Sequence, residues 1–88
     1  MQAFFILLFI FIFDNFGKVI ATLRREKKWT QEILATKTKM DKSYLGRLER
    51  GYKNISLKNI EKIAQALDVP ISEICKKAEL LSETNEMR

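Results

Sequence analysis

The strongest constraint on the fold of this chain is a series of short polar residues, each followed by apolar residues at helical spacing. Thr30, Asp41 and Ser56 are of the types whose side chains accept a hydrogen bond from the first turn of a helix. Gly51 follows the segment that Asp41 opens, in the position where a glycine typically ends a helix. Because these signals follow one another closely, the sequence predicts short helices joined by brief turns.

Five helices are expected, of which Asp14 or Asn15 caps the first, and Pro70 and Ser72 open the last. Their expected ranges are about 15–28, 31–37, 41–51, 57–67 and 70–81. A chain of 88 residues has room for one compact core, and 3 glycines and 1 proline are few for a turn-rich, strand-rich fold. The predicted fold is therefore all-α, a compact five-helix domain over residues 14–81.

The composition restricts the chemistry. The chain has no histidine and its only cysteine is Cys75, so neither a Cys/His zinc site nor an internal disulfide can form. A histidine base and a Cys-His nucleophile are excluded as well, and the sequence has no phosphate-binding glycine motif. We therefore expect a protein of the reducing cytoplasm that is not an enzyme and uses no metal and no cofactor.

Positive charge is concentrated in one part of the chain. The net charge of +5 and the pI near 9.5 suit a polyanionic partner, but they do not distinguish nucleic acid from an anionic membrane. Between Thr36 and Lys53, only Asp41 and Glu49 are acidic. The basic residues of that segment are Lys37, Lys39, Lys42, Arg47, Arg50 and Lys53.

The two ends of the chain fit this domain poorly. Residues 1–13 are nearly all Phe, Ile and Leu, too few for a spanning helix and without the basic start or cleavage site of a signal peptide. Three interpretations are open: an extension upstream of the true start codon, an apolar segment that packs on the domain or its dimer mate, and a membrane-contacting anchor. The acidic residues 82–88 lack periodic apolar positions and are predicted to be disordered.

The second and third expected helices, joined by a turn at residues 38–40, have the spacing of a helix-turn-helix. Ala35 is small where two steeply crossing helices come closest, and Met40, Leu45 and Leu48 follow as apolar positions. The run WTQEILATKTKMDKSYLGRLERGYKNISLKNIEKIAQALDVPISEI resembles the Cro/repressor (XRE-type) helix-turn-helix family. Within it, DKSYLGRLERGYKNISL resembles the controller proteins of restriction-modification systems.

The resemblance implies contacts to double-stranded DNA at matching positions. The implied contacts to base edges in the major groove come from Lys42, Ser43 and Arg47. The implied contacts to the phosphate backbone come from Gln31, Tyr44, Lys53 and Asn54. For Arg47 and Lys53 the alternative is a solvated surface charge. For Tyr44 the alternative is packing beside Met40, and for Gln31 it is simple capping of a helix.

The same resemblance places Arg24 and Glu49 in a structural ion pair between the first and third helices. Such a pair fixes an interhelical angle, whereas removal of one partner strands a charge at a cost of about 3 to 5 kcal/mol.

Two positions depart from the family pattern. Lys39 stands where the turn usually has glycine, and a left-handed conformation there costs roughly 1 to 2 kcal/mol. Gly46 lies inside the third helix, at a cost of about 1 kcal/mol relative to alanine.

The last helix has more apolar surface than one small core needs, from Ile71, Ile74, Cys75, Ala78 and Leu81. We expect a homodimer interface there, because two reading helices about 34 Å apart can enter successive major grooves of an inverted repeat. The sequence thus predicts a homodimeric transcriptional regulator, most similar to a restriction-modification controller. The alternatives are a phage-type repressor, an antitoxin that represses its own operon and, from another class, a membrane-tethered basic adaptor.

Overall fold

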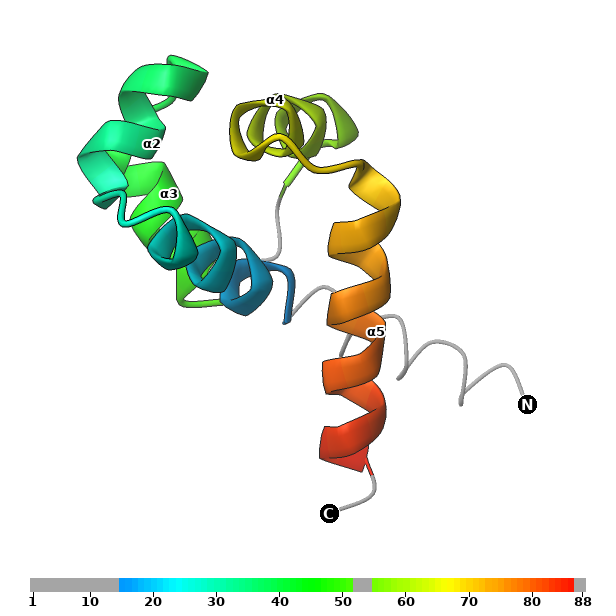
Figure 1. Cartoon of the computed structure of the whole chain (residues 1–88). Coiled ribbons are helices and arrows are strands. Elements are labelled where there is room, and N and C mark those ends of the chain that lie inside the picture. Colours follow the sequence, from blue (N-terminus) through cyan, green and yellow to red (C-terminus); the bar gives the residue numbers. More distant parts are fainter. Residues whose placement is uncertain (1–14, 52–54, 87–88) are drawn as a thin grey trace.

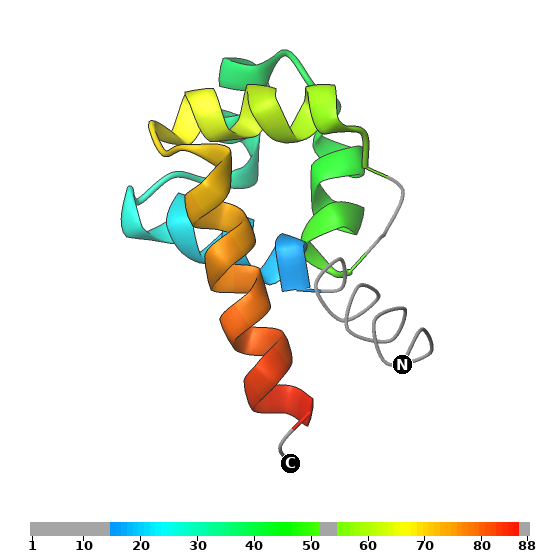
Figure 2. The same cartoon turned by 90° about the vertical axis from the view of Figure 1, so that its right-hand side faces the viewer.

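The structure of this chain is a computed structural model that describes residues 15–51 and 55–86, with side chains described as far as residue 81. Residues 15–26 form a first helical segment. The helices that follow are α2 (Gln31–Thr38), α3 (Lys42–Glu49), α4 (Leu57–Leu67) and α5 (Ile71–Glu86). Figures 1 and 2 show α4 lying across one end of the molecule and α5 leading away from it. These ranges contain no strand, and the predicted all-α, five-helix fold is confirmed for them.

The helices begin where the sequence predicts. Thr30, Asp41 and Ser56 each accept a hydrogen bond of 3.2 Å, from the backbone N–H of Ile33, Ser43 and Asn59 respectively. Gly51 has a φ of +108°, in the region that favours glycine, directly after the last residues of α3. These local signals therefore fix the bounds of the short helices.

The turn between α2 and α3 has left-handed geometry at Lys39. Its φ is 57° and its ψ is 34°, so a lysine adopts the conformation that glycine usually supplies, at a cost of roughly 1 to 2 kcal/mol. The N–H of Met40 donates to the carbonyl oxygen of Ala35 at 3.0 Å and closes the turn. This bond sets the direction in which α3 leaves α2.

All five helical segments contribute to one core. The side chains without exposed area are Ile20, Leu34, Leu45, Leu48, Ile63, Leu67, Ile74 and Ala78. They belong to a single apolar cluster, against which partly buried residues such as Trp29, Met40 and Tyr44 pack. Since α3 contributes Leu45 and Leu48, one side of that helix is held by the core while the other side is exposed to solvent.

Three expectations from the sequence need correction. Ile74 and Ala78 were assigned to a dimer interface, but both are fully buried in the core of the single chain, which leaves no exposed area on either side chain. The segment after Leu81 was expected to be disordered, yet α5 continues through Glu86, since no glycine or proline interrupts it and extending an existing helix costs little. The first helical segment ends at residue 26, before the positive φ of Lys28.

Residues 1–13, to which the apolar extension and the membrane anchor were assigned, lie outside the described residues. Within the ranges that are described, no helix has the length and hydropathy needed to cross a membrane.

Candidate nucleic-acid interface

A polar depression lies along α3 and beside the N-terminal end of α2. The residues that line it are Gln31, Asp41, Lys42, Ser43, Gly46, Arg47 and Arg50. The lining includes all three residues predicted to contact bases, Lys42, Ser43 and Arg47, and the side chain of each is exposed. The structure therefore brings the predicted base-reading residues together on one face of α3.

One of the predicted backbone-contacting residues, Tyr44, is placed differently from a simple surface contact. Tyr44 is half-buried and packs against the core, which favours the packing alternative. Lys53 and Asn54 lie outside the described residues. Their contacts to phosphate stay predictions.

The ion pair expected between Arg24 and Glu49 is present. Arg24 Nε donates to Glu49 Oε2 at 2.8 Å and its Nη2 donates to Glu49 Oε1 at 2.9 Å, so the pair is bidentate. The two side chains are 9% and 5% exposed. Arg24 Nη1 also donates to the carbonyl oxygen of Trp29 at 2.7 Å. The guanidinium thus joins the first helical segment to α3 and to the residue just before the cap of α2.

The geometry of this pair keeps the guanidinium of Arg24 charged. The hydrogen bonds to Glu49 raise the pKa of Arg24 above its ordinary value, and the charge of the carboxylate adds to this, although burial acts in the opposite direction. A raised pKa means that the contribution of Arg24 to stability is fully present below the ordinary pKa of an arginine and is lost only as the pH rises through the still higher pKa of the folded protein. The guanidinium therefore stays charged at any pH at which DNA binding is measured.

Gln31 belongs to the same network. Its Nε2 donates to Glu49 Oε1 at 2.8 Å, so the side chain predicted to contact a phosphate is hydrogen-bonded to the last residue of α3. The bond uses one of the two N–H groups of the amide. Gln31 is therefore oriented by the ion pair at the edge of the polar depression.

Two residues of this region, Arg50 and Glu32, are further candidates that the sequence did not mark. Arg50 was counted only as a charge, but it lines the depression, and its Nη1 lies 3.4 Å from the point where a Cβ on Gly46 would stand. Spacing of three residues from Arg47 on one helix was the signal that could have found it. Glu32 forms an ion pair with Lys42 across α2 and α3, with 3.0 Å between Oε1 and Nζ. No local pattern marks such a pair.

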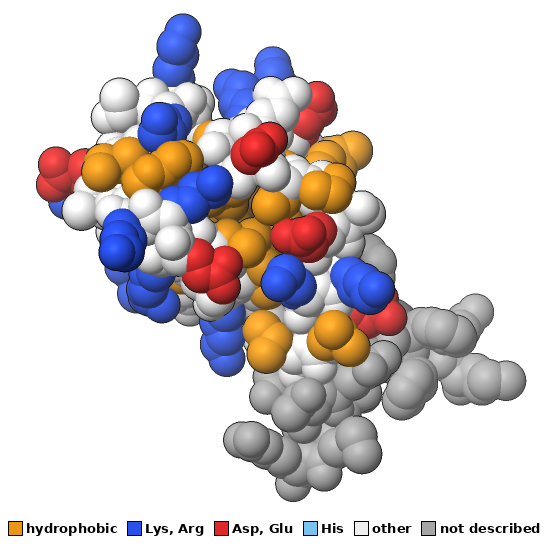
Figure 3. Space-filling view, viewed as in Figure 1, with side chains coloured by type: hydrophobic (Ala, Val, Ile, Leu, Met, Phe, Trp, Pro, Cys, Tyr) orange, Lys and Arg blue, Asp and Glu red, His pale blue; other side chains and the backbone are white. Residues whose placement is uncertain are grey.

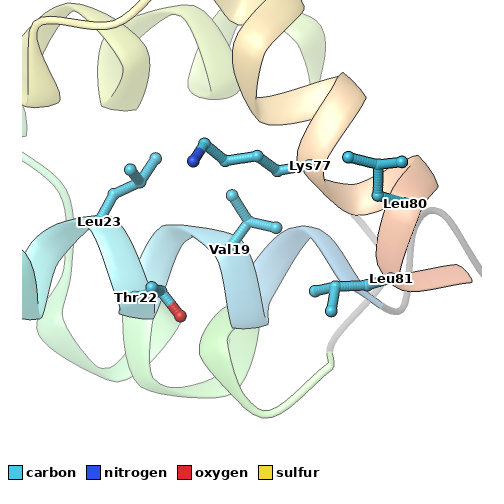
Figure 4. Close-up of a pocket in the computed structure, with 6 residues that line it drawn as sticks. All are labelled: Val19, Thr22, Leu23, Lys77, Leu80 and Leu81. Atoms are coloured by element: carbon cyan, nitrogen blue, oxygen red, sulfur yellow. The ribbon is translucent and has the colours of Figure 1, made fainter. Parts of the chain in front are cut away.

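An apolar groove lies on another face, between the first helical segment and α5. Figure 4 shows Val19 and Leu23 on the first helical segment and Leu80 and Leu81 on α5, with the side chain of Lys77 extending past Val19 toward Leu23. Leu80 is 54% exposed and Leu81 39%. Figure 3 shows hydrophobic side chains at the surface near the lower end of α5. Of the residues predicted to form a dimer interface, Leu81 is the one that this groove contains.

Comparison with known proteins gives consistent matches. A family model described as helix-turn-helix matches residues 20–74. The chain is 38% identical over 61 residues to control protein C.MunI of Mycoplasma sp, covering 68% of this chain and 82% of that protein. The restriction-modification controller protein C.AhdI from Aeromonas hydrophila matches with a TM-score of 0.67 and 44% identity, over 70% of this chain and 94% of the other. The C.Esp1396I controller tetramer, solved in complex with its natural 35-base-pair operator, matches with a TM-score of 0.71 and 34% identity, over 80% and 96%.

Proposed function

Because this chain belongs to the helix-turn-helix family and is related to restriction-modification control proteins, we propose that it is a transcriptional regulator that controls such a system by binding double-stranded DNA. The observation that carries the proposal is the division of α3 into two sides. Leu45 and Leu48 hold one side in the core, while Lys42, Ser43 and Arg47 lie exposed beside the polar depression. A rigid helix with such side chains fits the major groove of a duplex.

In this proposal the residues of α3 read the sequence. Arg47 donates two hydrogen bonds to O6 and N7 of a guanine, which no other base pair offers in that arrangement. Lys42 and Ser43, in the first turn of α3, donate to acceptors on neighbouring base edges. Each good bidentate contact discriminates against a wrong base by about 1 to 3 kcal/mol.

The phosphate backbone is held from the sides of the depression. Gln31, oriented by Glu49, donates its second N–H group to a phosphate at the N-terminus of α2, where the helix dipole favours an anion. Arg50, Lys53 and Asn54 add contacts from the end of α3 and the segment after it. These contacts position the protein and give salt-dependent affinity without sequence information.

We also propose that the chain acts as a homodimer on an inverted-repeat operator, by analogy with the operator-bound tetramer of C.Esp1396I. The corrected surface for this contact is the apolar groove of Val19, Leu23, Leu80 and Leu81, in place of Ile74 and Ala78. Exposed leucines next to a groove favour burial against a second copy, since apolar area removed from water stabilises by about 25 cal/mol per Å². Two copies place two α3 helices on one face of the duplex.

The proposed mechanism is occupancy. A dimer bound near its own promoter changes the access of the transcription machinery to the genes beside it, and this requires no catalytic residue, metal or cofactor. The site of action is the cytoplasm, where the operator DNA is. Residues 1–13 have no part in this proposal.

The experiment that tests the proposal is selection of bound sequences from a pool of random duplex DNA with the purified protein. The expected result is a palindromic consensus whose half-sites are separated by about one helical turn. Absence of any association with duplex DNA, even at low ionic strength, contradicts the proposal. An asymmetric single half-site supports DNA reading by α3 and contradicts the dimer.

A further inference from the structure

The ammonium group of Lys42 has a partner inside the protein. Its Nζ lies 3.0 Å from Glu32 Oε1, and this ion pair connects the first turn of α2 with the first turn of α3. The side chains are 54% and 73% exposed, so water reaches both of them. The pair stands at the edge of the polar depression, which Lys42 lines together with Ser43 and Arg47.

An exposed ion pair of this kind is weak and easily exchanged. A phosphate or a base oxygen in the depression competes with the Glu32 carboxylate for the same three N–H donors of Lys42. If Lys42 turns to the DNA, the carboxylate of Glu32 loses its partner in a region that faces phosphate charge. The competition for Lys42 and the unpaired carboxylate of Glu32 near phosphate both oppose DNA binding.

We propose, on the basis of the function proposed above, that Glu32 restrains the affinity of this protein for DNA by holding Lys42 in the unbound state. Glu32 is thus an acidic residue that sets how tightly the reading face binds, although it donates nothing to DNA. Its place in the first turn of α2 explains how the residue is tolerated beside a cationic face, because a carboxylate there interacts favourably with the helix dipole.

Because Glu32 lies in the first turn of α2, its substitution by glutamine is expected to change the stability of the protein and its affinity for DNA in opposite directions. Glu32→Gln removes a favourable charge from the start of α2, so the melting temperature is expected to fall slightly. The same change releases Lys42, so the affinity for DNA is expected to rise. A residue with a purely structural role would lower both quantities together.

The test is binding of a fluorescein-labelled duplex of mixed sequence, followed by anisotropy over a range of salt concentrations. Glu32→Gln is expected to bind about two- to fivefold more tightly than wild type at low salt, as an exposed pair of this strength implies. The slope of log affinity against log salt is expected to steepen by up to about one, since one more cation is available to displace counterions. Glu79→Gln is the matched control, because it removes the same charge from the exposed surface of α5.

A double-mutant cycle separates competition for Lys42 from general repulsion of DNA by a negative charge. In a Lys42→Met background, Glu32→Gln is expected to increase affinity by clearly less than it does when Lys42 is present, because only the repulsion between Glu32 and phosphate is then relieved. An equal gain in both backgrounds overturns the proposal, and so does a Glu32→Gln protein that binds no more tightly than the Glu79→Gln control. If wild type binds no duplex DNA, the proposed function fails first, whereas binding by wild type with no gain in Glu32→Gln removes this inference alone.

Discussion

Gly17 lies directly against the backbone of α3 at Leu48. A Cβ built at position 17 would stand 1.8 Å from the carbonyl oxygen of Leu48 and 2.9 Å from the Cα of Glu49. The contact is between backbones, so no side-chain rotation can relieve it. The first helical segment therefore approaches the end of α3 at a distance that only a glycine permits, close to the ion pair between Arg24 and Glu49.

Gly17→Ala is expected to be strongly destabilising. A methyl group at this position must push the first helical segment away from α3, and overpacking of this kind costs about 3 kcal/mol or more. Urea unfolding followed by the fluorescence of Trp29, the chain's single tryptophan, measures the change. A variant with wild-type stability would show that the two backbones are not packed as described.

Gly46→Ala is the matched substitution with the opposite expected result. A Cβ there meets Arg50 Nη1 at 3.4 Å and Gln31 Oε1 at 3.6 Å, which are ends of flexible side chains. Since alanine is the better helix former by about 1 kcal/mol, the free energy of unfolding is expected to rise. The free energy of DNA binding is expected to become less favourable by roughly 1 kcal/mol, because the methyl group enters the face of α3 that approaches the major groove. Unfolding and DNA titration of one preparation check both signs.

The features that local chemistry controls could be predicted from the sequence. The capping residues Thr30, Asp41 and Ser56 each bond to a backbone N–H within one helical turn of their own position. Their capping could therefore be predicted without knowledge of the fold. The three residues predicted to contact bases came from the family resemblance, and the structure places them together on the exposed side of α3. The pairing of Arg24 with Glu49 spans 25 residues and came from family resemblance alone.

The features that depend on packing between helices could not be predicted. The amphipathic pattern of α5 does not tell whether an apolar residue faces its own core or a second copy, and for this reason Ile74 and Ala78 were misplaced. The contact of Gly17 with Leu48 depends on where α3 ends in space. The pairing of Glu32 with Lys42 likewise depends on the angle between α2 and α3, which the left-handed turn at Lys39 sets.

Glu49→Ala is expected to lower the free energy of unfolding by about 3 to 5 kcal/mol, because it leaves the nearly buried guanidinium of Arg24 without its counter-charge. Thermal and urea unfolding measure the loss. In the double variant Arg24→Met, Glu49→Met, much of the stability is expected to return, since no charge is then stranded. Glu79→Ala, at an exposed position of α5, is the control and should change stability by no more than about 0.5 kcal/mol. An unchanged melting curve for Glu49→Ala rejects this account of the pair.

Leu81→Arg is expected to weaken self-association. The substitution places a charge in the apolar groove next to Val19 and Leu23, where burial against a second copy would strip it of water. Sedimentation at micromolar concentration is expected to show a dimer for wild type and a monomer for the variant. Leu57→Arg serves as the control, because Leu57 is 70% exposed at the start of α4 and lies outside the groove. If Leu57→Arg dissociates the dimer and Leu81→Arg does not, the dimer interface lies on α4 and the proposed groove is wrong.

Arg47→Ala and Lys53→Ala are expected to affect DNA binding in different ways. Arg47 lies in the polar depression on α3, so its loss removes a base contact and relaxes the preference at particular base pairs by about 1 to 3 kcal/mol. Lys53 is proposed to contact phosphate, so its loss weakens binding to all sequences and reduces the salt slope by about one. Titrations of the selected operator and of a mixed-sequence duplex at several salt concentrations separate the two effects. If Arg47→Ala weakens both duplexes equally, the guanidinium contacts phosphate, and the reading of bases then rests on Lys42 and Ser43.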